Sequence, residues 1–495
     1  NGIACKGCGF INIPRASLVV GGANLQDGAI ASLQAANNGN ALSIAGGGAS
    51  GVNVLDLIAP RLDVRANVSA ADAIRARAGF NTVDYASGQV TATAPAPQGV
   101  GNLDSYFLGA MQAGRINIVS TAAGAGVNVG GNLAGGDELS IRSAGALAVQ
   151  AAQLKGKQLV LDGASVDISG RVDSETGRDS KHDESWFIWK TGESSSASSK
   201  TDSSVKRASL QGDDVSIKAA GNAHVGAADI QGQDVKLSAG SLNLDGQLAE
   251  SSASSSDHAW KNSWAYNQDK SSVTQAQSVA RIKAQHDVEL NATAGGASIA
   301  GASVDAGNNL KLAATGDVKL SALLETDSSS DVGNRKNDGA ALETGSWNNS
   351  SSQQRLVQSQ LRAGNALGVT ASGDIAAQAA VLKSGGDAVL SAQGKTTLAT
   401  QTSANSSSTQ NGKTYWGGIG GGGNQNNSDS ATVNTGSAVN AGGKLFINGD
   451  AGIAINGSQA KGTQGAYAKT QSGGVVIDSA LDLAQTRTDQ RTGTA

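Results

Sequence analysis

The sequence predicts an all-β fold, a parallel β-helix in which short strands stack in successive coils, and three observations predict it. The apolar residues are mostly Ala, Val, Leu and Ile, whereas Phe, Tyr and Trp together make up 3% of the 495 residues. Pairs of alternating apolar residues return with a short, regular period. Gly, Asn and Asp stand between these pairs, where tight turns need them. A narrow, repetitive interior fits these features better than a deep globular core.

The apolar pairs recur with two periods. Ile217 is followed by Leu237, and Leu290 by Leu312, in both cases after one short period of about 20 residues. A second, longer period relates Ile217, Leu290, Val369 and Ile447, which recur at nearly constant intervals. One short unit holds several strands and cannot bury its own apolar face, whereas stacked units can, because each strand pairs with its equivalent in the next coil. We expect about 16 coils, a rod on the order of 75 Å long.

Four polar, Ser-rich stretches interrupt the repeat, at about 171–207, 249–280, 325–360 and 401–438. Each contains at least one Trp, whereas the coils between them contain none. The Trp residues favour β-hairpins that leave the stack and pack on its outside; disordered linkers are the alternative that a Ser-rich composition also fits. Each Trp then either covers its own coil or belongs to an interaction surface. The residues concerned are Trp186, Trp189, Trp260, Trp264, Trp347 and Trp416.

The first 100 residues differ in composition, since they hold all four prolines and both cysteines of the chain. Strand alternation with Gly breaks continues here, and residues 81–106 predict an extra-helical hairpin or loop. Cys5 and Cys8 predict a small local disulfide of an exported protein. A zinc site would need further ligands nearby, and a redox motif would need a βαβ context; the sequence supplies neither.

Several functional classes fit the sequence poorly. The net charge of −4 and the pI near 5.7 lack the basic footprint of a nucleic-acid-binding protein. No apolar stretch reaches the roughly 20 residues that cross a bilayer. The densest acidic patch, from Asp173 to Glu193, is balanced by Arg and Lys and is typical of a solvated face. We therefore predict no catalytic, cofactor-binding or metal-binding residues. The abrupt start without a signal peptide predicts a mature product or a fragment.

The opening NGIACKGCGFINIPRASL resembles the secretion domain of the two-partner secretion exoproteins, which include filamentous haemagglutinins and contact-dependent growth inhibition proteins. The residues that match are Asn1, Gly2, Ile3, Cys5, Cys8, Gly9, Phe10, Ile11 and Asn12. The stretch from Ile58 to Ile118 is also similar to this family. The resemblance assigns residues 1–135 to the C-terminal part of a secretion domain. The Ser-rich repeats of residues 136–495 resemble haemagglutinin repeats.

The resemblance implies a right-handed β-helix that crosses the outer membrane of a Gram-negative bacterium through a dedicated transporter. The periplasmic domains of that transporter would recognise the secretion domain, and residues 1–12 are expected to contribute to export. The protein would then be secreted or displayed on the cell surface.

The expected function is that of a filamentous adhesin or stalk, not of an enzyme. It would bind a receptor or polysaccharide on host cells, sibling cells or biofilm matrix. One alternative is a stalk that delivers a C-terminal toxin to neighbouring bacteria. The other is a β-helix carbohydrate-active enzyme, which would need a carboxylate cluster that the sequence does not supply. We expect no cofactor, no nucleic acid partner and no membrane-spanning segment.

Overall fold

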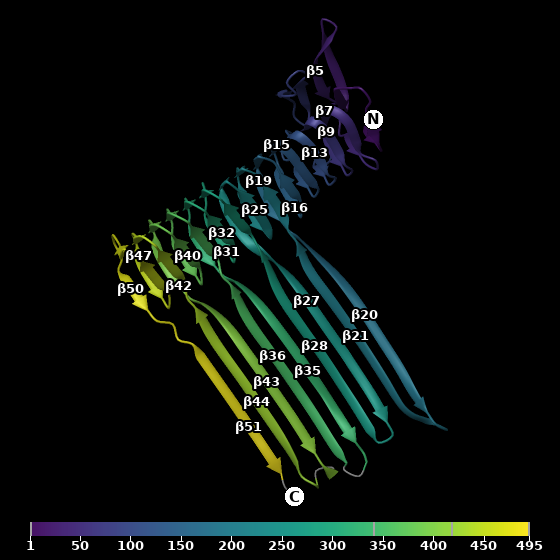
Figure 1. The fold of residues 1–495 in the computed structure, drawn as a ribbon, viewed down its shortest axis with the longest axis vertical. Coiled ribbons are helices and arrows are strands. Elements are labelled where there is room, and N and C mark those ends of the chain that lie inside the picture. The colour runs from purple at the N-terminus through teal and green to yellow at the C-terminus, as the bar shows by residue number, and fades with distance from the viewer. Residues whose placement is uncertain (1, 340–341, 417–418, 494–495) are drawn as a thin grey trace.

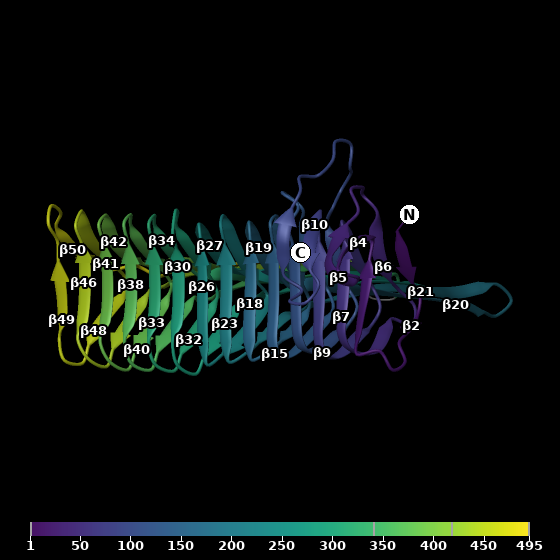
Figure 2. The ribbon, with the colours of Figure 1, turned by 90° about the horizontal axis from the view of Figure 1, so that it is seen from above.

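Short parallel strands wind into a long rod, and a broad antiparallel sheet extends from one side of it (Figure 1; Figure 2). The computed structural model describes residues 2–339, 342–416 and 419–493. Within those ranges, no helix is both long and apolar enough to cross a membrane. The prediction of an all-β, parallel β-helix with extra-helical hairpins is confirmed.

The rod has three faces, and on each face every strand pairs in parallel with the equivalent strand of the next coil. The first face consists of β1 (Ile3–Cys5), β6 (Ala41–Ile44), β8 (Arg61–Val64), β12 (Ser105–Phe107), β14 (Val127–Val129), β16 (Ala146–Gln150), β19 (Ser165–Ser169), β24 (Asn222–Gly226), the start of β27 (Ser241–Lys261), β31 (Ala297–Ala300), β34 (Val318–Ser321), β39 (Ile375–Gln378), β42 (Lys395–Ala399), β47 (Gly452–Asn456) and β50 (Val475–Asp478).

The second face consists of β2 (Cys8–Gly9), the first halves of β7 (Ala49–Ala59), β9 (Val68–Ala78), β13 (Met111–Ser120) and β15 (Asn132–Ser143), then β17 (Gln153–Lys155), β22 (Ala208–Gln211), β25 (Ala228–Gly232), β29 (Arg281–Ala284), β32 (Ser303–Ala306), β37 (Gln360–Ala363), β40 (Val381–Ser384), β45 (Ala438–Ala441) and β48 (Gln459–Gly462). The third face consists of β3 (Arg15–Val19), the second halves of β7, β9, β13 and β15, then β18 (Gln158–Gly163), β23 (Asp214–Ala219), β26 (Asp234–Ala239), β30 (Val288–Ala292), β33 (Leu310–Ala314), β38 (Leu367–Ala371), β41 (Ala388–Ala392), β46 (Leu445–Gly449) and β49 (Ala466–Lys469).

One inward-facing aliphatic position of the third face repeats in every coil and fills the interior of the rod. Ile217 pairs with Leu237, and Leu290 pairs with Leu312, as their spacing in the sequence predicts. The side chains alternate across each strand, so this position points inward while its neighbours point outward. The ladder runs through Leu18, Leu57, Ala76, Ile118, Ile141, Leu161, Ile217, Leu237, Leu290, Leu312, Val369, Leu390, Ile447 and Ala468.

The rod is shorter than the sequence predicts. The rod has fourteen complete coils rather than about 16, which at about 4.8 Å per coil gives about 67 Å rather than 75 Å. The difference arises because residues 21–35 and 81–93 leave the coils. They form a separate sheet in the order β11 (Val90–Thr93), β10 (Asn81–Asp84), β5 (Ala29–Ala35), β4 (Gly21–Gln26). The expected extra-helical hairpin within residues 81–106 is therefore β10–β11.

The Ser-rich stretches form four long hairpins that pair with one another. Their strands are β20 (Arg171–Trp186), β21 (Lys190–Lys206), the remainder of β27, β28 (Trp264–Val279), β35 (Leu323–Asn337), β36 (Glu343–Val357), β43 (Gln401–Thr414) and β44 (Gly422–Thr435), with β51 (Leu483–Gly493) at one edge. Neighbouring hairpins join edge to edge through the antiparallel pairs β21–β27, β28–β35 and β36–β43. One continuous antiparallel sheet results, which we call the hairpin sheet (Figure 1).

The expectation that the hairpins pack on the coils through their Trp residues is wrong, and so is the idea that each Trp covers its own coil. Trp186 ends β20, Trp264 begins β28, and Trp416 follows β43, all at the hairpin turns. A strand of sixteen residues, such as β20, carries its far end about 50 Å from the rod. The strands extend straight outward because edge-to-edge pairing satisfies their backbone groups beyond the first few residues at the rod.

Candidate secretion and interaction sites

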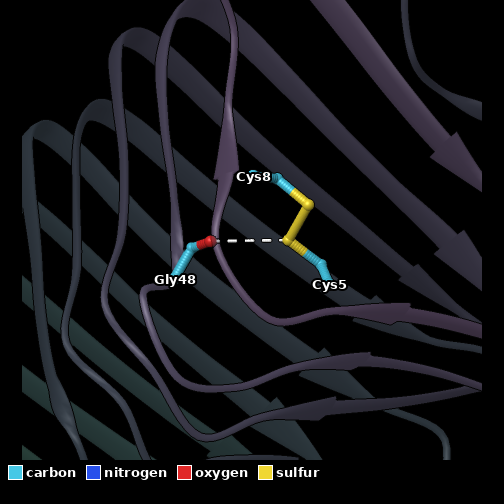
Figure 3. The surroundings of a disulfide bond; sticks show 3 residues. All are labelled: Cys5, Cys8 and Gly48. Atoms are coloured by element: carbon cyan, nitrogen blue, oxygen red, sulfur yellow. Dashed lines mark hydrogen bonds between the residues drawn. A yellow bond between two sulfur atoms is a disulfide. The ribbon is translucent and has the colours of Figure 1, made fainter.

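The Cys5–Cys8 disulfide lies at a corner of the first coil (Figure 3). Cys5 ends β1, which pairs with β6, and Cys8 begins β2, which pairs with β7. The bond therefore joins the first face of the rod to the second. Cys5 Sγ lies 3.4 Å from the carbonyl oxygen of Gly48. Because a disulfide sulfur carries no proton, this is a polar contact rather than a hydrogen bond.

Gly48 is required by the geometry of this corner. Its φ is +75°, in the left-handed region. A Cβ at this position would lie 1.9 Å from the carbonyl oxygen of Asn67 in the next coil. Any other residue would push the corners of the second and third coils apart, so glycine lets these coils stack closely.

The other residues of the predicted secretion motif occupy different environments. Ile3 and Phe10 are half-buried and pack against the core of the rod. Ile11 is 83% exposed, and Asn12 adopts a φ of +57° as the chain turns toward β3. Gly2 and Gly9 are exposed beside them, and Asn1 lies outside the described residues. The motif thus combines a buried part that shapes the first coil with an exposed part open to a partner.

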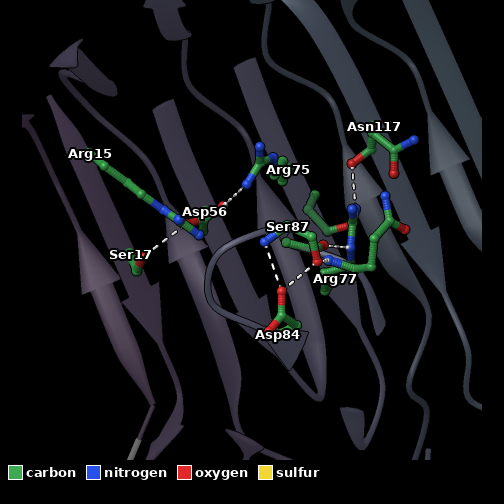
Figure 4. A network of polar contacts seen from close by, with 11 residues as sticks. Arg15, Ser17, Asp56, Arg75, Arg77, Asp84, Ser87 and Asn117 are labelled. Carbon is green, nitrogen blue, oxygen red and sulfur yellow. Dashed lines mark hydrogen bonds and ion pairs between the residues drawn. The ribbon is translucent and has the colours of Figure 1, made fainter. Parts of the chain in front are cut away.

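A buried polar network on the third face was not singled out by the sequence analysis (Figure 4). At its centre is Asp56, which is 2% exposed. One carboxylate oxygen accepts hydrogen bonds from Arg15 Nε at 2.7 Å and from Ser17 Oγ at 2.8 Å. Arg75 Nη1 lies 3.9 Å from the other oxygen, an ion-pair distance too long for a hydrogen bond. The network ties three consecutive coils together through β3, β7 and β9.

A third arginine, Arg77, holds the four-stranded sheet β11–β10–β5–β4, which we call the outer sheet, against the rod. Arg77 donates to the carbonyl oxygens of Gly88 at 3.1 Å and Asn117 at 2.9 Å. Burial, and then the neighbouring Arg75, lower the pKa of Arg77 to about 10, while Asp56 opposes that shift. The guanidinium is therefore still charged at neutral pH. The Arg15 guanidinium also lies 4.0 Å over the ring of Tyr85, which follows β10.

The sequence contains a weak signal for this network. Ser17, Asp56, Arg75 and Asn117 are directly paired in successive coils, at an outward-facing position. Outward charges of this kind normally indicate a solvated face. They are buried here only because the outer sheet covers them. A run of opposite charges at one outward position of consecutive coils is the pattern that could have revealed it.

A second polar cluster lies on the surface of the middle coils. His224 on β24 bonds through Nδ1 to Asp167 on β19 at 2.5 Å, and through Nε2 to Asp245 on β27 at 2.9 Å. The hydrogen bond to Asp167, followed by the one to Asp245, raises the pKa of His224 to about 10. Both ring nitrogens donate at once only in the protonated imidazolium, so the histidine bridges three coils as a cation.

This cluster predicts that the rod loses stability at alkaline pH. Because the folded-state pKa of His224 is raised above the unfolded value of 6.5, its contribution is complete below about pH 6.5. It is lost as the pH rises through about 10. The side chain is more than a third exposed, so solvent screening limits the effect to about 1 kcal/mol. Thermal unfolding measured from about pH 6.5 to about pH 10 should show a loss of stability in the native chain that is absent in His224→Gln. The same pH dependence in both proteins would contradict the stabilising role of His224.

The structure brings two of the predicted Trp residues together and leaves others apart. Trp264 stacks on Tyr266 with ring centroids 5.9 Å apart, and Tyr266 lies 5.8 Å from Trp347. Trp347 also donates from Nε1 to Asp331 at 2.8 Å. This aromatic cluster joins the second hairpin to the third. Trp260 lies half-buried opposite Glu193 of the first hairpin. The remaining ones are exposed at turns: Trp186, Trp189 and Trp416.

Comparison with known proteins agrees with these features. Residues 1–149 match the family described as TPS secretion domain, and residues 261–350 match the hemagglutinin repeat. The first match contains the disulfide corner and the Asp56 network; the second contains β28 of the second hairpin, and β35 and the first half of β36 of the third. The chain belongs to the two-partner secretion exoproteins. This exoprotein is secreted across the outer membrane of a Gram-negative bacterium.

Similar proteins match the exoprotein over different lengths. It is 35% identical over its whole length to a protein named hemolysin from Proteus mirabilis and to another named hemolysin from Serratia marcescens. It spans 30% of the length of each. It is 34% identical, over 34% of its length, to a protein named tRNA nuclease CdiA from Escherichia coli, and this match covers 5% of that protein. No solved structure matches the chain.

Proposed function

We propose that this chain is the export-directing and rod-forming part of a two-partner secretion exoprotein of the hemolysin type. Its first coils are recognised by the periplasmic domains of an outer-membrane transporter, and the rod carries the remainder of the exoprotein away from the cell. The observation that carries this proposal is the match of the whole chain, hairpins included, to two proteins named hemolysin. The segment itself acts by shape and contact rather than by catalysis.

Stacked coils suit export through a transporter for a physical reason. Each coil pairs only with its neighbours, so the coils fold one after another as they emerge, and each completed coil templates the next. The only disulfide of the chain spans residues that are three positions apart and closes no long loop that would have to cross the membrane folded. Folding outside the cell can then favour forward movement.

A filamentous adhesin is the second candidate function. The exposed aromatic residues at the turns of the hairpin sheet favour it, because exposed apolar groups commonly mark contact surfaces. A host or bacterial surface receptor or a polysaccharide would be the partner. The toxin-delivery stalk rests on the shorter match to the CdiA protein alone and is the weaker alternative.

Ile11 is the residue through which transporter recognition can be tested. Ile11→Asp places a charge on a side chain that is exposed in the folded coil, so the fold should be kept while an apolar contact with the transporter is lost. We expect the full exoprotein carrying Ile11→Asp, co-expressed with its transporter, to appear in the medium at about one tenth of the native amount. Immunoblotting of medium and cell fractions measures this.

The matched control is Leu25→Asp, an exposed aliphatic residue of β4 in the same segment. It should leave secretion unchanged. Native secretion without any transporter would contradict the export proposal as a whole. Native secretion of Ile11→Asp, together with loss for Phe10→Ala, would instead show that the motif acts through the fold of the first coil.

A further inference from the structure

The turn of the first hairpin presents four consecutive large apolar side chains to solvent. These residues are Trp186, Phe187, Ile188 and Trp189, and the central two are each 79% exposed. Within the turn, the contact that the structure shows between these side chains is the one between the rings of Phe187 and Trp189, with centroids 6.3 Å apart. Leaving so much apolar surface in water is unfavourable by roughly 25 cal/mol per Å². A group of this kind marks a contact surface rather than a structural element.

The other three hairpin turns each expose at least one large apolar side chain. Trp264 is exposed at the second turn, Leu342 at the third, and Trp416 at the fourth, where Ile419 is 80% exposed. The turns differ in sequence and length, so the common feature is their amphipathic composition and not a shared shape. We call the four turns together the tip edge of the hairpin sheet.

Strand register places the four turns at the same level. Lys261 is paired with Gly192, Trp264 with Asn337, and Thr344 with Thr414. The last paired residues of all four hairpins therefore fall within about two rows of the sheet, and these strand ends line the edge farthest from the rod (Figure 1). Adjacent turns are two strands apart, about 9.6 Å, so the tip edge is about 30 Å long and one strand thick.

Each turn also carries a lysine beside its apolar residues. Lys190 and Lys261 flank the first two turns, and Lys336 and Lys413 flank the third and fourth. Lys190 lies 2.7 Å from Glu184, and Lys336 lies 3.0 Å from Asp338, so the charges at the edge are mixed. Aromatic residues and Lys next to a few apolar side chains are typical of segments that lie at the boundary between lipid headgroups and acyl chains.

We propose that the tip edge docks on the surface of a phospholipid bilayer, with the apolar side chains of the four turns in the interfacial layer. A straight, thin line of turns fits a planar partner. The turns share an amphipathic composition but not a shape. This fits a bilayer interface, which accommodates apolar side chains of any shape at the depth of the acyl-chain boundary. The faces of the sheet behind the tips are rich in Ser and Asn, so the sheet stands on the bilayer by its edge. This docking does not depend on the export function, since the purified chain can be tested without a transporter.

Vesicle binding by the purified 495-residue chain tests the proposal. Large unilamellar vesicles of phosphatidylcholine should sediment the chain, and brominated acyl chains should quench its Trp fluorescence. Replacing the first turn by four serines (Trp186→Ser, Phe187→Ser, Ile188→Ser and Trp189→Ser) should lower the partition coefficient at least about tenfold. The pair Trp416→Ser with Ile419→Ser, on another hairpin, should lower it severalfold.

The matched control is Leu25→Ser with Ile30→Ser, two exposed apolar residues on the paired strands β4 and β5 of the outer sheet, which is not part of the tip edge. It should bind vesicles as the native chain does. Far-UV circular dichroism of every variant should stay native, because all tip substitutions lie at or beyond the ends of the paired strands. Absence of vesicle binding by the native chain overturns the proposal. Equal loss in the control, or tip-dependent self-association without lipid, also overturns it.

Discussion

Leu237→Asp is expected to open the rod at its middle. Leu237 is fully buried and lies between Ile217 and Leu290 in the aliphatic ladder. Truncating a buried Leu to Ala alone costs about 2–5 kcal/mol. A carboxylate in the same dry interior adds the cost of burying an unpaired charge, so we expect a total loss of more than about 5 kcal/mol. Urea unfolding followed by far-UV circular dichroism measures it.

The damage should remain local, because each coil of a solenoid is stabilised mainly by its two neighbours. Limited proteolysis with mass mapping should show new cuts at the turns on either side of β26, while the coils before β18 stay protected. The control is Ser238→Asp, which places the same residue one position along the strand, pointing outward. It should change stability by no more than about 0.5 kcal/mol. Similar unfolding of the two variants would mean that the rod interior is not a dry aliphatic ladder.

The coils could be predicted from the sequence because each rung of the ladder has to be apolar. Ile217, Leu290, Val369 and Ile447 recur at nearly constant intervals for this reason. A polar residue at such a position would be buried without a partner. The interior of the rod therefore constrains residue type at fixed spacing, which is the kind of information that a single sequence retains.

The pairing between hairpins could not be predicted, because it is made mainly by backbone hydrogen bonds, to which side-chain contacts such as that of Tyr266 with Trp347 only add. One row across the hairpin sheet contains seven serines between two arginines. It consists of Arg178, Ser199, Ser254, Ser271, Ser330, Ser350, Ser408, Ser428 and Arg487. Backbone hydrogen bonds hold these strands edge to edge and require no particular side chain. A Ser-rich strand in such a sheet has the same composition as a Ser-rich linker in water.

The secretion-domain region likewise contains one feature that the sequence predicts and one that it does not. The pairing of Cys5 with Cys8 follows from residue type and spacing, and the structure contains that disulfide. The network around Asp56 is buried because residues 21–35 and 81–93 form the outer sheet, which packs over it. Without that sheet, the charged side chains would be exposed to solvent. Burial of that kind is set by contacts between segments far apart in the chain. The sequence immediately around Asp56 therefore gives no indication that this side chain is buried.

Asp56→Ala is expected to destabilise the first coils by about 3–5 kcal/mol, because it leaves Arg15 and Arg75 partly buried without their carboxylate. Loss of the charge also removes the group that opposes the lowered pKa of Arg77, so the outer sheet should loosen together with the coils. All six Trp residues lie beyond residue 180, so Trp fluorescence would not report this change. Hydrogen exchange with mass analysis of peptides from residues 15–120 measures it instead.

The control for this variant is Asp63→Ala, which removes the same side chain from an exposed pair with Arg65 in the next coil. It should cost less than about 1 kcal/mol, because an exposed ion pair is screened by solvent. Asp56→Asn should fall between the two, since an amide can still accept from Ser17 but leaves the surrounding arginines without a counter-charge. Equal exchange in Asp56→Ala and Asp63→Ala would contradict a structural role for the network. We expect protection from exchange to fall in the order Asp63→Ala, Asp56→Asn, Asp56→Ala. That order would show that the charge of Asp56, and not only its hydrogen bonds, stabilises the first coils.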